Sequence, residues 1–294
     1  MNRRQFARTA AAATLSVAVP SILSSSQASD AKSSPLKLSV MLWTVYQNLP
    51  FEQRLEKVVD AGFHAVELVK EFDHWSEEDF RLANAKKRDL GITFDATAGV
   101  WTGIADPEAR HKFIADLRRF LPVADKLECA AIIVLSGDRI EGLSRDAHHQ
   151  ACIEALKQGA DIAAKQNITL LLENIDPEEN PRYYLTSVAE GFEIIRKVDH
   201  PHVKFLYDFY HEQISEGNLI EKLEKNIGQV GLAHIADVPG RHQPGTGEIN
   251  YANIFRKLAE LNYGGYAAME FEPAGDPLGA LRSARELAIR SAQD

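Results

Sequence analysis

Four residues whose side chains could bind a metal follow apolar runs of the sequence. Glu173 ends LLLE, Asp208 ends VKFLYD, His234 lies in GLAHIAD, and Glu270 follows YAAM. A single acid at a strand end is usually a helix cap or an ion-pair partner. Four such residues, each after an apolar run that would otherwise bury an unpaired charge, favour a shared metal ion. Three carboxylates and one imidazole suit Mn²⁺ or Mg²⁺, and Co²⁺ or Zn²⁺ also accept this ligand set.

Two of these residues, Glu173 and Glu270, could also perform acid–base chemistry. A divalent metal makes the C–H bond beside a carbonyl more acidic and stabilises the enediolate that forms on deprotonation. One carboxylate can then remove a proton from carbon while the other returns one. This pair therefore predicts an isomerase or epimerase that acts on a small hydroxy-carbonyl compound or sugar.

Three further residues are candidates for substrate binding. His211 and Arg241 lie three and seven residues beyond Asp208 and His234. Either could donate hydrogen bonds to substrate oxygens, and Arg241 could hold a carboxylate. Single polar residues in loops also often serve only the structure of the loop. Glu67, in AVELV, is the third candidate because it lies near the end of another apolar run.

The elements that must position these residues alternate regularly along the chain. Apolar runs predict strands at Leu38–Leu42, Ala65–Val69, Ile92–Ala96, Ala130–Leu135, Thr169–Glu173, Val203–Asp208, Val230–Ile235 and Tyr266–Phe271. Amphipathic patterns predict helices at Phe51–Ala61, Ser76–Leu90, Pro107–Ala124, Arg145–Gln166, Ser187–Val198, Leu219–Asn226, Tyr251–Leu261 and Pro277–Ser291.

This alternation predicts an α/β fold, a single (β/α)8 TIM barrel. Continuous apolar strands indicate a parallel sheet that is buried on both faces. Eight βα units in one chain of this length favour a closed barrel, whose catalytic groups lie where strands end and βα loops begin. An open doubly wound sheet is the alternative. It is weakened because MLWTVYQNLP, after the first strand, contains no Gly-rich phosphate turn.

The first residues predict export. Met1–Ala28 combines Arg3-Arg4, a short apolar segment and a small-residue ending, which is typical of a twin-arginine signal peptide. The apolar segment is too short to be a membrane span. We therefore expect a signal peptide at 1–28, a linker at 29–36 and a barrel at 37–294. We also expect the Tat translocase as a partner during export, and a periplasmic or secreted mature protein.

The composition limits the classes of molecule that the protein could bind. The formal net charge of the 294 residues is −9, and it becomes −12 when Arg3, Arg4 and Arg8 leave with the leader. Such an acidic surface argues against nucleic acid as a partner, so a small-molecule substrate is expected and a homo-oligomer stays open. A disulfide between Cys129 and Cys152 is compatible with an oxidising compartment, but we expect two unpaired thiols.

Two longer motifs carry a family resemblance. DFYHEQISEGNL and HIADVPGRHQPGTGEINY resemble the hydroxypyruvate isomerase group of the xylose isomerase-like TIM barrels. AGFHAVEL and the ending MEFEP fit the wider superfamily, which includes the ketose 3-epimerases. The likeness covers Leu36 to Ser291. It implies substrate contacts from His211 and Arg241, and a divalent metal held by Glu173, Asp208, His234 and Glu270.

Two positions depart from the hydroxypyruvate isomerase pattern. That group usually carries Lys two residues after the last Glu, where this chain has Glu272. It often has Gln at the position of His234, and His matches the epimerase pattern instead. If the last strand continues to Glu272, this carboxylate faces the site and disfavours an anionic substrate. Isomerisation between hydroxypyruvate and tartronate semialdehyde is therefore the main hypothesis, and epimerisation of a ketose at C3 or of another sugar is the alternative.

Two other functions fit the sequence less well. An endonuclease of the apurinic-site type needs additional His and Asp ligands and a basic face, yet no His ends Ala65–Val69 or Ala130–Leu135. A non-catalytic periplasmic sugar-binding protein would have no need for both Glu173 and Glu270.

Overall fold

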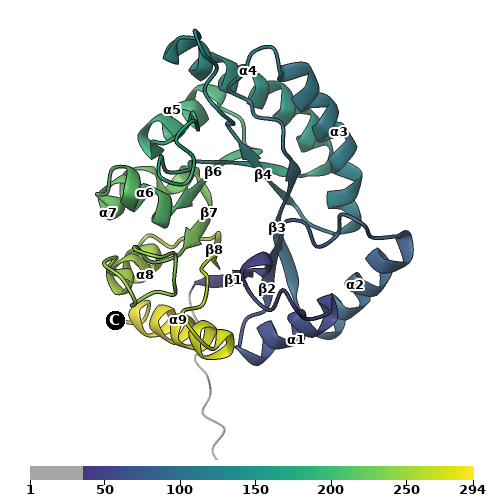
Figure 1. Ribbon diagram of the computed structural model, residues 1–294, viewed down its shortest axis with the longest axis vertical. Helices are drawn as coiled ribbons and strands as arrows, with labels where there is room; N and C mark the ends of the chain where they lie inside the picture. Colours follow the sequence, from purple (N-terminus) through teal and green to yellow (C-terminus); the bar gives the residue numbers. More distant parts are fainter. Residues whose placement is uncertain (1–35) are drawn as a thin grey trace, which may run out of the picture. The chain divides into compact units, whose positions relative to one another are not determined.

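The computed structural model describes residues 36–294, so the leader Met1–Ala28 and nearly all of the linker 29–36 lie outside the described residues. Eight parallel strands form a closed barrel in the order β1-β2-β3-β4-β5-β6-β7-β8, and helices surround the ring of strands (Figure 1). The predicted single (β/α)8 barrel is confirmed. The strands are Lys37–Met41 (β1), Ala65–Leu68 (β2), Thr93–Val100 (β3), Ala131–Leu135 (β4), Thr169–Glu173 (β5), Val203–Asp208 (β6), Val230–Ile235 (β7) and Tyr266–Met269 (β8).

Each predicted helix forms within a few residues of its expected bounds. The α-helices of the described chain are Phe51–Asp60 (α1), Glu77–Asp89 (α2), Arg110–Lys126 (α3), Arg145–Ala163 (α4), Val188–Val198 (α5), Phe209–Ser215 (α6), Leu219–Asn226 (α7), Tyr251–Glu260 (α8) and Pro277–Ser291 (α9). Single 3-10 turns follow β1, α4 and α7, at Leu42–Thr44 (η1), Ala164–Gln166 (η2) and Ile227–Gln229 (η3). Among these helices, none is both long and apolar enough to cross a membrane.

Two differences from the predicted elements affect the mouth of the barrel. The short helix α6 was not predicted. It begins directly after β6 because Asp208, the last strand residue, caps it by accepting hydrogen bonds from the N–H groups of Tyr210 and His211. The last strand also ends earlier than expected, at Met269. Glu270 and Glu272 therefore belong to the βα loop that follows β8.

Alternation along the strands places the candidate ligands on the barrel axis. Successive strand residues point to opposite faces, and a small inner cluster inside the barrel includes Leu171, Leu206, Leu232 and Ala268. Glu173, Asp208, His234 and Glu270 each follow one of these residues by two positions. They therefore lie one layer above the apolar interior, at the C-terminal mouth.

Strand register keeps these positions level with one another. Asp208 pairs with His234 between β6 and β7, and Ile235 pairs with Met269 between β7 and β8. The backbone N–H of Glu270 donates to the carbonyl of Ile235 over 3.1 Å. This bond fixes the first residue of the last loop against a neighbouring strand. The four side chains therefore start from a rigid frame.

The two cysteines of the chain are free and buried, as predicted. Burial raises the pKa of the Cys129 thiol to about 12. It also raises the pKa of the Cys152 thiol. Both thiols therefore stay protonated at neutral pH and act as small apolar side chains of the core.

Candidate metal centre and active site

The four predicted ligands meet at the C-terminal mouth of the barrel. Glu173, Asp208, His234 and Glu270 are buried, and each offers a ligand atom within 4.8 Å of the others. His234 Nδ1 faces all three carboxylates. It lies 2.7 Å from Glu270 Oε2, 3.4 Å from Glu173 Oε1 and 3.7 Å from Asp208 Oδ2. The fold thus gathers on one point the side chains that sequence spacing singled out.

The facing atoms of this cluster fit a cation. Asp208 Oδ2, His234 Nδ1 and Glu270 Oε2 are buried and have no hydrogen-bond partner in the described chain. A buried polar atom without a partner costs about 1–3 kcal/mol, and such atoms are rare in folded proteins. Three carboxylates around one imidazole also leave an excess of negative charge. A divalent ion would satisfy both requirements, and this mixed oxygen and nitrogen donor set suits the predicted metals.

Glu67, which the sequence predicted as a substrate contact, lies behind the imidazole of His234. Its side chain is fully buried, and its Oε2 lies 3.1 Å from Nε2 of His234. The carboxylate therefore accepts a hydrogen bond from the ring nitrogen that points away from the other three acids. A carboxylate in this position fixes the tautomer and orientation of a metal-binding histidine and makes it more basic.

Burial and charge shift the pKa values of these groups in different directions. Burial raises the pKa of Glu173. Burial also acts to raise the pKa of Glu270, but Arg241 and His234 together hold it below its usual value. Burial disfavours the charged form of His234, yet Glu270 and Glu67 raise the pKa of its imidazole well above the ordinary value. The cluster therefore strongly favours positive charge at its centre.

His211 is anchored by Asp176, a residue that the sequence analysis did not single out. His211 Nδ1 lies 2.6 Å from Asp176 Oδ2, and its Nε2 lies 3.4 Å from Asp208 Oδ2. Asp208 and Asp176 outweigh the effect of burial and raise the pKa of His211 to about 9. Asp176 is itself fixed by the backbone N–H groups of Glu178 and Glu179. His211 thus presents a positively charged N–H at the edge of the metal ligands.

Arg241 bridges two acids over the mouth of the barrel. Its guanidinium lies 3.0 Å from Glu270 Oε2 and 2.7 Å from Glu179 Oε2, and it is 5.2 Å from the centre of the Tyr210 ring. Its backbone has a positive φ of 55°, which a residue other than glycine rarely adopts. The side chain is 15% exposed. Arg241 is therefore placed both to hold Glu270 and to reach a substrate.

The loop that carries Arg241 is organised by Asp237. This fully buried carboxylate accepts hydrogen bonds from the N–H groups of Gly245, Gly247 and Ile249 over 2.9–3.0 Å. A side chain at Gly247 would meet the carbonyl oxygen of Val238 at 2.0 Å. The glycines of the PGTG sequence thus let this loop fold tightly around one acid.

Glu272 does not occupy the position that the sequence suggested. Because β8 ends at Met269, Glu272 lies in the loop with an exposed side chain. Its backbone N–H donates to the carbonyl of Arg241 over 2.8 Å, and its carbonyl lies 2.7 Å from Nδ1 of His242. Glu272 therefore joins two loops through its backbone. The strand alternation that would have aimed its carboxylate at the site does not extend this far.

Comparison with known proteins gives matches that extend over most of the barrel. The model of the xylose isomerase-like TIM barrel family matches residues 55–291. The 2-oxo-tetronate isomerase of Pectobacterium atrosepticum is 31% identical over 247 residues, which cover 81% of this chain and 93% of that protein. The hydroxypyruvate isomerase of Escherichia coli is 30% identical over 243 residues, which cover 81% of this chain and 94% of that protein.

A solved structure is also similar over almost its whole length. The crystal structure of an AP endonuclease of family 2 from Brucella melitensis superposes with a TM-score of 0.77 at 27% identity. The match covers 86% of this chain and 99% of that one. The likeness therefore extends over most of this chain.

Proposed function

The chain belongs to the xylose isomerase-like TIM barrel family, and on that premise we propose that it is a divalent-metal-dependent isomerase that works through an enediolate. Relatives named as 2-oxo-tetronate and hydroxypyruvate isomerases make it an enzyme of the isomerase and epimerase type with a small-molecule substrate. The proposed reaction interconverts hydroxypyruvate and tartronate semialdehyde, or a close analogue with the same hydroxy-carbonyl group.

The observation that carries this proposal is the cluster of four buried residues whose ligand atoms lie within 4.8 Å of one another at the barrel mouth. Glu173, Asp208, His234 and Glu270 would hold the ion, and Mn²⁺ or Mg²⁺ suits their donor atoms best. When bound, the ion would act as a Lewis acid that makes the C–H bond beside the substrate carbonyl more acidic. Glu67 would keep His234 in its binding orientation.

The two glutamates provide the acid–base chemistry in this proposal. Glu173 ends β5 and Glu270 follows β8, and β6 and β7 separate these strands in the barrel. Their carboxylates therefore approach the same point from different sides. One removes the proton from the hydroxyl-bearing carbon, a proton then returns to the carbonyl carbon, and the hydroxyl proton passes to the former carbonyl oxygen. Arg241, 3.0 Å from Glu270, keeps that carboxylate oriented.

His211 and Arg241 are the proposed substrate contacts. Both carry positive charge at the mouth, and Asp176 and Glu179 hold them in place. A charged N–H that is already fixed donates to a developing oxyanion without reorganisation at the moment of reaction. These two residues would therefore stabilise the oxygens of the enediolate while the glutamates move protons.

Epimerisation of a ketose at C3 is the second candidate, favoured by His234 in place of the Gln that hydroxypyruvate isomerases often carry. It would use the same two glutamates, with the proton returned to the opposite face of one carbon. An endonuclease finds less support. The other acid–histidine group of the described chain, Asp176, Glu179 and His211, already forms hydrogen bonds within itself and to Arg241.

The test starts from the mature protein expressed in the periplasm, where the proposed leader would deliver it. Metal analysis measures the number of bound metal ions per chain. Each candidate substrate is then incubated with the protein in D₂O. Deuterium should enter beside the carbonyl of hydroxypyruvate, and tartronate semialdehyde should form. Deuterium in a neutral ketose with inversion at C3 would instead establish the epimerase. No exchange with any hydroxy-carbonyl compound by the metal-loaded protein would refute both.

A further inference from the structure

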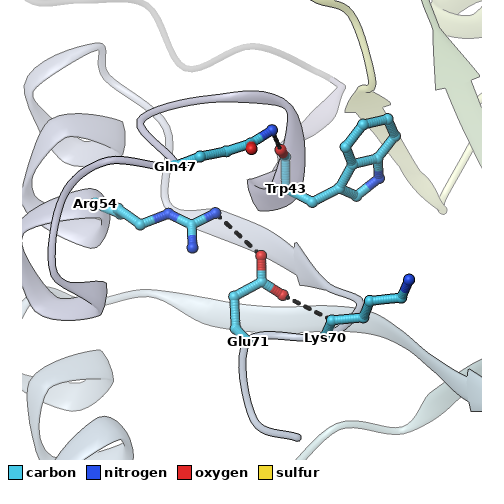
Figure 2. A pocket seen from close by; sticks show the side chains of 5 residues that line it. All are labelled: Trp43, Gln47, Arg54, Lys70 and Glu71. Carbon is cyan, nitrogen blue, oxygen red and sulfur yellow. Dashed lines mark hydrogen bonds and ion pairs between the residues drawn. The ribbon is translucent and has the colours of Figure 1, made fainter.

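A hollow of about 280 Å³ lies at the C-terminal ends of β1 and β2. It is lined by Trp43, Gln47, Arg54, Lys70 and Glu71 (Figure 2). β1 pairs with both β2 and β8, so the hollow opens at the same barrel mouth as Glu270. Lys70 follows Glu67, the acid behind His234, by three residues. The hollow is thus a neighbour of the site and has no role in the chemistry described above.

Two of the charged groups in the hollow neutralise each other. The guanidinium of Arg54 lies 3.1 Å from Glu71 Oε1, and the two side chains are 11% and 4% exposed. Glu71 Oε2 also accepts a hydrogen bond from the N–H of Val69 over 2.8 Å. This buried pair fixes the loop after β2. It leaves no net charge to attract a ligand.

Lys70 differs from the other cations of the described βα loops. Arg241 and Arg182 pair with carboxylates, and Arg139 donates to the carbonyl of Pro181. The ammonium of Lys70 instead lies 5.5 Å from the centre of the Trp101 ring, and no acid in the described chain forms an ion pair with it. Its ammonium therefore has no acid partner that would compete with an anionic ligand.

One aromatic side chain, Trp101, lies against this ammonium, and a second, Trp43, lines the same hollow. Figure 2 shows Trp43 and Lys70 extending to the same side of the hollow, away from the Arg54–Glu71 pair. Trp101, at the end of β3, is 52% exposed, which is unusual for so large an apolar side chain. Indole rings beside a cation exclude water from it and so strengthen its attraction for an anion. Exposed aromatic groups around one charge are typical of a binding surface.

We propose that Lys70, whose ammonium lies against Trp101, binds the carboxylate of the substrate at the rim of the barrel. Arg241 and His211 are already paired with acids, so a cation without an acid partner suits the charged end of a 2-oxo acid. Lys70 supplies this cation. The inference deepens the proposed function and rests on it, because it assigns the anionic end of that substrate to a side chain.

Direct binding tests the assignment without turnover. D-glycerate, a hydroxy acid that cannot isomerise, is titrated calorimetrically into the metal-loaded native protein and into Lys70→Met, Lys70→Arg and Arg139→Met. Loss of one partly screened ion pair weakens binding by about three- to tenfold. We expect this loss for Lys70→Met, but less than a twofold change for Lys70→Arg. Arg139→Met, which removes another loop cation, is the matched control. Equal affinity of the native protein and Lys70→Met, or an equal loss in Arg139→Met, would overturn the assignment.

Turnover then separates this inference from the proposed function. In Lys70→Met the ratio of kcat/KM for hydroxypyruvate to that for dihydroxyacetone should fall about fivefold, mainly through KM, because only hydroxypyruvate carries a carboxylate. An equal fall for both substrates would contradict a role in charge recognition. If the native protein turns over neither compound while Lys70→Met still weakens glycerate binding, the proposed reaction is wrong and the carboxylate site stands.

Discussion

Glu67 Oε2 lies 3.1 Å from Nε2 of His234, although 167 residues separate the two along the chain. The contact joins β2 to β7 through the interior of the barrel. It leaves the other ring nitrogen to face the three acids at the mouth. The orientation of the only imidazole in the proposed ligand set therefore depends on a residue from the opposite half of the chain.

Glu67→Gln tests this dependence. The amide keeps the size of the side chain but removes the charge that holds the imidazole, so affinity for Mn²⁺ should fall about 10- to 100-fold while the barrel stays folded. Equilibrium dialysis against a metal buffer measures the affinity. Glu190→Gln is a matched control, because it removes the charge of a carboxylate that lies 3.3 Å from Nδ1 of His149, a histidine outside the proposed ligand set. Unchanged affinity in Glu67→Gln would show that Glu67 has no such role.

The two carboxylate oxygens of Asp208 have different surroundings. The substitutions Asp208→Asn and Asp208→Ala separate their effects. Oδ1 caps α6, and Oδ2 faces the ligand cluster without a hydrogen-bond partner. Asp208→Asn should keep the cap and lose stoichiometric metal together with activity. Asp208→Ala should also lose about 1 kcal/mol of stability, the usual value of a helix cap. Metal analysis and urea unfolding measure the two effects.

Asp276→Ala is the control for Asp208. It removes the cap of α9 but no proposed ligand, so stability should fall while metal content is unchanged. Full metal occupancy in Asp208→Asn would remove Asp208 from the ligand set.

Glu212 predicts a pH dependence of stability that is separate from the ligand cluster. Its side chain is fully buried beside Lys222, and burial raises its pKa from 4.5 to about 7. The unfolded chain therefore ionises first as pH rises. The stability associated with Glu212 is fully present below pH 4.5 and is lost by about pH 7. In Glu212→Gln the free energy of unfolding should therefore fall by about 1–3 kcal/mol less over this pH range than it does in the native protein.

Urea unfolding at pH 5 and at pH 8 measures the effect of Glu212. Glu221→Gln is a suitable control, because Glu221 forms an exposed pair with Lys225 on α7 and should leave the pH dependence of the native protein unchanged. If native protein and Glu212→Gln lose the same stability between the two pH values, Glu212 is not buried as a neutral acid.

The leader predicts export by the twin-arginine route. A reporter fused after Met1–Ala28 should reach the periplasm only in cells with an intact Tat translocase. Lys at both positions of the Arg3-Arg4 pair should keep the reporter in the cytoplasm. Fractionation of the two fusions measures this, and export of the Lys variant at the native rate would refute the prediction.

Local patterns were sufficient to predict the barrel and the location of the ligand cluster. Apolar runs that end in Glu173 or Asp208 mark both a buried strand and the layer where it leaves the interior. The bounds of the last strand were less predictable. Nothing local distinguishes Phe271 from a strand residue, and the strand ends at Met269 because the next loop bonds to Arg241. Helix α6 was missed because the strand residue Asp208 caps it without any intervening turn.

Roles that depend on distant partners could not be predicted from spacing. Asp176 anchors His211 across 35 residues. Glu67 is aimed at an imidazole rather than at substrate because of where β2 lies relative to β7 in the closed barrel. A strand-end acid near the mouth and one a layer below it have the same sequence pattern, so only the three-dimensional depth of the side chain distinguishes them.

The pairing of β1 with β8 has a consequence for biosynthesis. Until Tyr266–Met269 leaves the ribosome, β1 and β7 are both unprotected edges, and such edges favour aggregation. The ligand set is completed at the same moment, because Glu270 follows the last strand directly. A nascent chain that stops short of β8 thus lacks both a closed sheet and the full set of proposed ligands. Loss of metal uptake and loss of solubility should therefore begin at the same C-terminal truncation point.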